Sequence, residues 1–161
     1  MAVNPVPPDR AALTPSLTVA PCAEAIDWYV RVFGAEEFGP RMTGPDGLVA
    51  HAELRIADSV IMLADPWPDG PTQTPAQLGG STMALFLYQA DADEIWARAV
   101  EAGAEVVFPF EVQFYGDEGG RIRDPFGHTW GIGRHVEDVS DEEMERRMAA
   151  FYEEQAGGES G

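Results

Sequence analysis

The stretch AIDWYVRVFGAE, residues 25–36, decides the fold because it returns in degenerate form later in the chain. Its echo is EIWARAVEAGAE, residues 94–105, in which Gly103-Ala104-Glu105 falls on Gly34-Ala35-Glu36. The offset from Gly34 to Gly103, 69 residues, also places Ile95 on Ile26. A repeat of half-chain length in 161 residues indicates two copies of one supersecondary unit, with the function between them.

Each copy predicts the order strand, helix, strand, strand, strand. Alternation of apolar and polar residues indicates the strands, and apolar residues three or four apart indicate the helices. The first copy has predicted strands at Leu13–Val19, Glu37–Thr43, Leu48–Ile56 and Ser59–Ala64, with a helix at Ala23–Phe33. The second has predicted strands at Thr82–Tyr88, Glu105–Val112, Gly119–Arg123 and Thr129–Gly133, with a helix at Asp91–Ala102.

We therefore predict an α+β fold: two tandem βαβββ modules that form a curved mixed sheet around a cavity, plus a C-terminal helix. Ser140 is a suitable N-cap for that helix, and Glu143 occupies the capping-box position. Its apolar stripe is expected to pack in a core or an interface, and consists of Met144, Met148, Phe151 and Tyr152. The expected divisions are a disordered lead 1–12, modules 13–65 and 81–135, a linker 66–80, a helix 136–156 and a disordered tail 157–161.

Charge and cysteine content restrict the possible partners and location. The net charge of −18 excludes nucleic acid as the expected partner, because binding phosphates needs a basic surface, and it disfavours anionic membranes. No apolar run reaches membrane-spanning length, and the Pro-rich start lacks the apolar core of a signal peptide. The single cysteine, Cys22, fits a reducing compartment. We predict a cytoplasmic protein with no nucleic-acid or membrane partner.

The ordered set of segments resembles the glyoxalase/bleomycin-resistance/dioxygenase superfamily, whose members are also called vicinal oxygen chelate proteins. The segments that carry the likeness are LTV at 17–19, AIDWYVRVFGA at 25–35, HAELRIADSVIMLAD at 51–65 and GRIRDPFGHTW at 120–130. The chain looks most like the phosphonate-operon-type glyoxalase-like subgroup. The resemblance implies that each module curls into a half-barrel, that paired modules enclose a cavity, and that the protein is a homodimer.

In metal-dependent members of this superfamily, four ligands come from the opening and closing strands of the two modules. The corresponding positions here are Thr14, Met62, Gly131 and either Met83 or Ala84. A hydroxyl, a thioether, an apolar group and a glycine do not assemble a divalent-metal site. We therefore predict no metal and no cofactor at the family position, with the metal chemistry either lost or moved elsewhere in the cavity.

Few other residues suggest catalysis. His51 and Glu53 share one strand face with Arg55, and a His-x-Glu pair either binds metal or moves protons, so both are weak catalytic candidates. An ordinary solvated strand face is the alternative. His128 is expected to point off the concave face in a structural role, and Cys22 to be a buried or incidental thiol.

Strand alternation predicts an apolar, aromatic cavity with a few hydroxyls, the usual composition of a small-molecule site. Either Arg121 or Arg123 would orient an anionic group on the ligand. The predicted ligand-binding residues are Thr14, Ser16, Met62, Trp67, Phe86, Phe110, Phe114, Tyr115 and Arg123.

Three functions fit this pattern. The first is metal-free binding of a small, partly aromatic molecule, of the sequestration or resistance type. The second is a superfamily enzyme (lyase, isomerase or dioxygenase) with a relocated or absent metal site. The third is a structural or interaction role with a vestigial pocket. The sequence leaves open whether the cavity forms within one chain or across a dimer.

Overall fold

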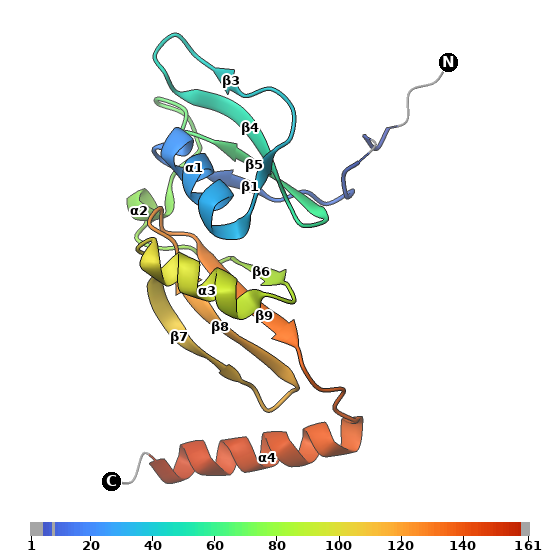
Figure 1. Cartoon of the computed structure of the whole chain (residues 1–161). Helices are drawn as coiled ribbons and strands as arrows, with labels where there is room; N and C mark the ends of the chain where they lie inside the picture. The colour runs from blue at the N-terminus through green and yellow to red at the C-terminus, as the bar shows by residue number, and fades with distance from the viewer. Residues whose placement is uncertain (1–4, 8, 159–161) are drawn as a thin grey trace.

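The computed structural model of the chain describes residues 5–7 and 9–158 and contains two sheets (Figure 1). Residues 1–4, 8 and 159–161, part of the lead and tail expected to be disordered, lie outside the described residues. The first sheet has the order β1 (Ser16–Thr18), β5 (Ser59–Ala64), β4 (Val49–Ile56) and β2 (Glu36–Glu37), with β3 (Met42–Thr43) also paired to β4. The second has the order β6 (Ala84–Tyr88), β9 (Thr129–His135), β8 (Asp117–Arg123) and β7 (Glu105–Val112).

The two sheets have the same topology, which confirms the tandem βαβββ modules. In each, the opening strand runs parallel to the closing strand and the other pairs are antiparallel. Helix α1 (Cys22–Phe33) follows β1, and α3 (Ala92–Glu101) follows β6. The last helix, α4 (Asp141–Gly158), lies beyond the second sheet at the far end of the molecule from the N-terminus (Figure 1).

Two predicted elements differ from the structure. The predicted strand Glu37–Thr43 is interrupted between β2 and β3, because Gly39 has a left-handed φ of 85° and Pro40 has no N–H to donate. The predicted linker contains a short helix, α2 (Pro75–Leu78), whose N-cap Thr74 forms a capping box with Gln77.

The register of the sheets settles the one-residue ambiguity in the second module. Ser16 pairs with Met62 in the first sheet, and Phe86 pairs with Gly131 in the second. The closing strands therefore differ by 69 positions, as do the helices, and the opening strands by 70, so the second module has one residue fewer than the first between its opening strand and its helix. The position that corresponds to Thr14 is Ala84, not Met83.

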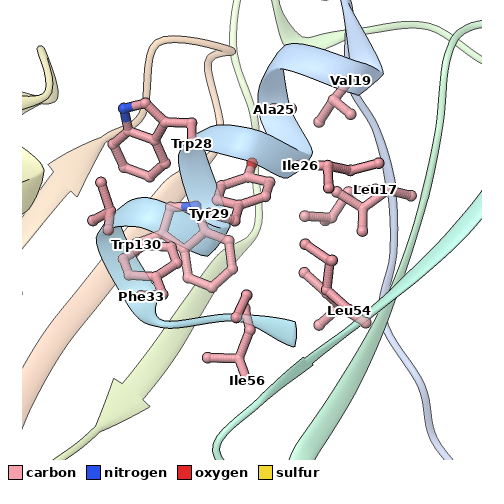
Figure 2. Packing of buried hydrophobic residues seen from close by; sticks show 14 of the residues in the cluster. Leu17, Val19, Ala25, Ile26, Trp28, Tyr29, Phe33, Leu54, Ile56 and Trp130 are labelled. Carbon is pink, nitrogen blue, oxygen red and sulfur yellow. The ribbon is translucent and has the colours of Figure 1, made fainter. Parts of the chain in front are cut away.

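Helix α1 joins the two modules into one hydrophobic core. One side of the helix packs on the apolar face of the first sheet, and the other meets Trp130 of β9, whose ring centre lies 5.4 Å from Tyr29 and 4.6 Å from Phe33 (Figure 2). The Trp28 indole also donates across the modules to the carbonyl of Ala102, at 2.9 Å. Because α1 and α3 occupy the space between the modules, the opposite face of each sheet points outward.

Asp124 is the polar centre of this junction. It is 3% exposed and accepts hydrogen bonds from the Tyr29 hydroxyl at 2.6 Å and the Trp130 indole at 2.9 Å. Its second oxygen accepts from the backbone N–H groups of Phe126 and His128, both at 2.9 Å. This buried carboxylate therefore holds the Asp-Pro-Phe-Gly turn and ties α1 to β9.

A second buried carboxylate, Asp65, caps helix α1 from a distance. One oxygen accepts from the backbone N–H of Cys22 at 2.9 Å, and the other from that of Val49 at 2.8 Å. The helix has no side-chain cap of its own at Pro21, so Asp65 supplies the missing acceptor. Cys22 is a fully buried thiol, and this burial, followed by the charge of Asp65, raises its pKa to about 12.

Candidate functional site

The outer face of the second sheet, opposite α3, presents two rows of side chains across its four strands. The first row is Phe86, Gly131, Arg121 and Phe108, in the order β6, β9, β8 and β7. The second row is Tyr88, Gly133, Gly119 and Glu111. Gly133 and Gly119 leave the middle of the second row without side chains. We call this flat part of the sheet the glycine floor, and larger residues surround it.

A cavity of about 470 Å³ lies over this floor. We call it the aromatic cavity, and its principal side chains are Phe86, Tyr88, Phe108, Tyr115, Arg121 and Phe151. Tyr88 and Phe108 are 54% and 56% exposed, so the rings form an open apolar surface. Such a surface with a few polar groups is typical of ligand and interface sites.

Arg121 is held between two rings of the cavity wall. Its guanidinium carbon lies 5.5 Å from the ring centre of Phe86 and 5.7 Å from that of Phe108, within the range of cation–π contacts. Arg123, two residues along the same strand, instead pairs with Glu105 at 2.8 Å and does not line the aromatic cavity. Of the two arginines considered from the sequence, the structure places Arg121 in the cavity.

Asp117 organises one end of the cavity. It accepts a hydrogen bond from the Tyr88 hydroxyl at 2.8 Å, and its other oxygen lies 2.8 Å from Nδ1 of His135. Hydrogen bonds to Asp117 and then Asp138 raise the pKa of His135, and the bond to Asp117 raises the pKa of Tyr88. Both oxygens of Asp117 are thus engaged, which fixes the orientation of the Tyr88 ring.

Helix α4 adds a wall to the cavity. Phe151 packs on Phe114, with ring centres 5.1 Å apart, and Phe114 packs on Tyr115 at 5.3 Å. Arg147 anchors the helix: it donates to both oxygens of Glu137 and to the carbonyl of Phe114. The predicted apolar stripe of α4 is not part of the core, since Met148, Phe151 and Tyr152 are all exposed, and Phe151 instead lines the cavity. Packing of this stripe in an interface stays a prediction.

The family metal positions do not fit a metal. The Thr14 hydroxyl donates to the carbonyl of Ala11, Met62 offers a thioether and Ala84 no donor. At Gly131 a Cβ would lie 2.4 Å from the Phe86 ring, so this ring fills the space of a side chain on the closing strand. Among residues 5–7 and 9–158, no group of three or more His, Cys, Asp or Glu side chains is arranged to hold a metal ion.

The two catalytic candidates meet on the outer face of the first sheet. His51 Nε2 lies 3.0 Å from Glu53 Oε1, and the other Glu53 oxygen pairs with Arg10. Glu53 is only 8% exposed, and Arg55 stacks on Phe38 beside it. Arg10 therefore holds this carboxylate in an ion pair and covers it from solvent. The other histidine considered from the sequence, His128, is buried and lies 3.0 Å from the carbonyl of Thr18, in agreement with a structural role.

The predicted ligand-binding residues do not gather in one place. Phe86 and Tyr115 line the aromatic cavity, and Phe114 supports it from behind. Ser16 lines a separate hollow beside α2, and Trp67 lines another beside β4. Thr14, Met62 and Arg123 lie outside the aromatic cavity.

Phe110 faces the opposite side of the sheet from Phe108. Simple alternation would place both on one face, but the pairing of β7 with β8 shifts between Phe108 and Glu111. The shift turns Phe110 toward Trp96 and the core, with ring centres 5.4 Å apart. Bulges of this kind re-aim side chains and leave no clear signal in one sequence.

Several residues that line the aromatic cavity were not predicted from the sequence. Tyr88 follows Phe86 by two positions, so strand alternation alone would have found it. Asp117 was missed because β8 begins two residues before the predicted strand start at Gly119. Glu111 depends on the β7 irregularity and Phe151 on where α4 docks, for which the sequence has no local signal.

The chain is an α+β protein. Its two βαβββ modules share one hydrophobic core, and in each module the opening strand runs parallel to the closing strand. The model of the Glyoxalase/Bleomycin resistance protein/Dioxygenase superfamily matches residues 11–132, and the chain belongs to this superfamily. The resemblance seen in the sequence is thereby confirmed. Among the described residues, no helix combines the length and apolar character needed to cross a bilayer.

Similar proteins span most of this chain. An uncharacterized protein of Mycobacterium bovis is 42% identical over 153 residues, which cover 93% of this chain and 97% of that protein. Protein YjdN of Escherichia coli is 31% identical over 140 residues, covering 74% of this chain and 92% of its own. The crystal structure of TioX from Micromonospora sp. ML1 has a TM-score of 0.59 and 25% identity, covering 81% of this chain and 100% of that chain.

Proposed function

We propose that this chain is a metal-free binding protein that takes up a small, partly aromatic molecule in the aromatic cavity. The observation that carries the proposal is the glycine floor walled by exposed rings, where the ring of Phe86 lies over the position of a family metal ligand. A flat ligand ring gains contact area from such walls, and each aromatic pair contributes about 0.5–1.5 kcal/mol beyond burial. Sequestration of the ligand needs no reacting group.

A fluorescent aromatic probe tests the proposal. We expect N-phenyl-1-naphthylamine, which is uncharged, to bind with saturation, and Phe108→Ala to weaken its binding roughly five- to tenfold through lost ring contact. Trp67→Ala is the matched control, because Trp67 is 63% exposed and lies outside the aromatic cavity. Elemental analysis after incubation with nickel, zinc, manganese and ferrous iron is expected to find no stoichiometric metal.

Two results would overturn this proposal. If Trp67→Ala weakened binding and Phe108→Ala did not, the ligand site would lie elsewhere. If one metal were retained per chain and lost in His51→Ala, the superfamily-enzyme alternative would lead, since His51 and Glu53 lie 3.0 Å apart. The cytoplasmic location and the lack of a nucleic-acid partner stay predictions from charge and cysteine usage.

We also propose that the protein works as a homodimer. Among the described residues, those that line the aromatic cavity all belong to the second module and to the segment from there through α4. A second copy of the chain that places its first module over the cavity would cover the exposed rings and enclose the ligand. Sedimentation velocity is expected to give twice the chain mass, and Phe108→Asp to shift the population toward the single chain; a wild-type monomer at high concentration would exclude this assembly.

A further inference from the structure

The charges around the aromatic cavity are compensated within the protein, with two exceptions. Asp117 is engaged by Tyr88 and His135, and Glu118 pairs with Arg134 at 2.7 Å. Among the residues that the structure describes, Arg121 has ring contacts but no hydrogen bond or ion pair, and the Glu111 carboxylate has neither. These two side chains are therefore the charges that the cavity offers to a ligand.

Among the residues that the structure describes, Arg121 is the only one with a basic side chain that lines the cavity. The rings of Phe86 and Phe108 lie against its guanidinium, and the N–H donors of a guanidinium lie in its plane. The stacking thus restrains the side chain while the edge that binds anions stays free. A planar oxyanion matches that edge, because both groups can form two parallel hydrogen bonds.

The glycine floor lies between Arg121 and the aromatic wall of the cavity. Gly119 lies two residues from Arg121 on β8, and Asp117 two residues further, so the open floor lies between Arg121 and the Tyr88–Tyr115–Phe151 wall. A ligand ring on the floor can meet those aromatic side chains while an acidic substituent reaches Arg121.

We infer that the aromatic cavity selects planar aromatic anions and that Arg121 binds their anionic group. This inference rests on the proposed function and names the ligand class of the same site. Nonspecific attraction does not explain such a preference, because the chain carries a net charge of −18 and repels anions overall. Glu111 lies on β7 beside Gly119, across the floor from Tyr88, and limits the affinity by like-charge repulsion.

Two probes that differ by one charged group test the inference. The anion 8-anilinonaphthalene-1-sulfonate is N-phenyl-1-naphthylamine with an added sulfonate. We expect the wild-type protein to bind the anion more tightly, and Arg121→Gln to weaken anion binding roughly tenfold while it changes binding of the neutral probe less than twofold. Arg121→Lys should retain part of the affinity, since it keeps the charge and loses the planar fork.

Arg123→Gln is the matched control, because Arg123 lies two residues away on β8 and pairs with Glu105 outside the cavity. Glu111→Gln is expected to tighten anion binding several-fold while leaving binding of the neutral probe unchanged. Equal binding of the two probes, or an equal loss of both in Arg121→Gln, would overturn the inference but leave the proposed function in place. Absence of binding by either probe would overturn the proposed function itself.

Discussion

Replacing Asp124 by alanine is expected to lower the free energy of unfolding by about 3–5 kcal/mol, because four donors lose their shared acceptor in a buried site. Two of these donors, the Tyr29 hydroxyl and the Trp130 indole, belong to different modules. The loss therefore loosens the junction as well as the turn. Urea unfolding followed by tryptophan fluorescence measures the change, provided the slope against urea stays constant.

Asp58→Ala is the control for Asp124, since Asp58 lies in the exposed β4–β5 turn and accepts only from its neighbour Ser59. Its expected effect is within about 0.5 kcal/mol. If Asp124→Ala does not fold, Tyr29→Phe removes one of the four hydrogen bonds, with an expected loss of about 1–2 kcal/mol. A loss below about 1 kcal/mol for Asp124→Ala would show that the junction does not depend on this carboxylate.

The hydrogen bond from Tyr29 to Asp124 should stabilise the folded protein over a defined pH range. Burial, and then Asp124, raises the pKa of Tyr29 well above its ordinary value. A raised pKa gives stabilisation that is complete below the unfolded-state pKa, near 10 for tyrosine, and is lost as the pH rises through the folded-state value. The difference in stability between wild type and Tyr29→Phe should therefore be constant at neutral pH and shrink only in strongly alkaline solution.

Replacing Asp65 by alanine is expected to lower the free energy of unfolding by about 2–4 kcal/mol. The change leaves the N–H groups of Cys22 and Val49 without their acceptor and removes a negative charge from the N-terminus of α1. Chemical denaturation measures the loss. Asp46→Ala, which removes an exposed acceptor for Leu48 in the β3–β4 turn, is the control and should change the stability by less than about 1 kcal/mol.

Cys22 reports whether the Asp65 variant acts at the helix start. The thiol is buried in the wild-type protein with a pKa of about 12, so a disulfide reagent at pH 8 should modify it slowly. In Asp65→Ala the helix start is less stable, and labelling is expected to be at least tenfold faster under native conditions. Unchanged labelling together with full stability would refute the remote cap.

Short-range patterns of apolar and polar residues were sufficient to predict most of the helices and strands. The apolar spacing of α1 and the period-two alternation of β4 reflect burial of one face, and both are visible in a window of about ten residues. The half-chain repeat then required two units of one topology. Where local backbone chemistry intervened, as at Gly39-Pro40 between β2 and β3, the predicted single strand failed.

The amino-acid sequence by itself determined the two βαβββ modules, the absence of metal-binding side chains at Met62 and Gly131, and the net charge of −18. These features depend on residue type and short-range periodicity alone. Only the tertiary structure decided which rings share a cavity. The irregularity in β7 sends Phe108 outward and Phe110 into the core, and the docking of α4 brings Phe151 to the sheet. Such contacts join residues far apart in the chain, and their geometry depends on strand register and packing rather than on any local sequence pattern.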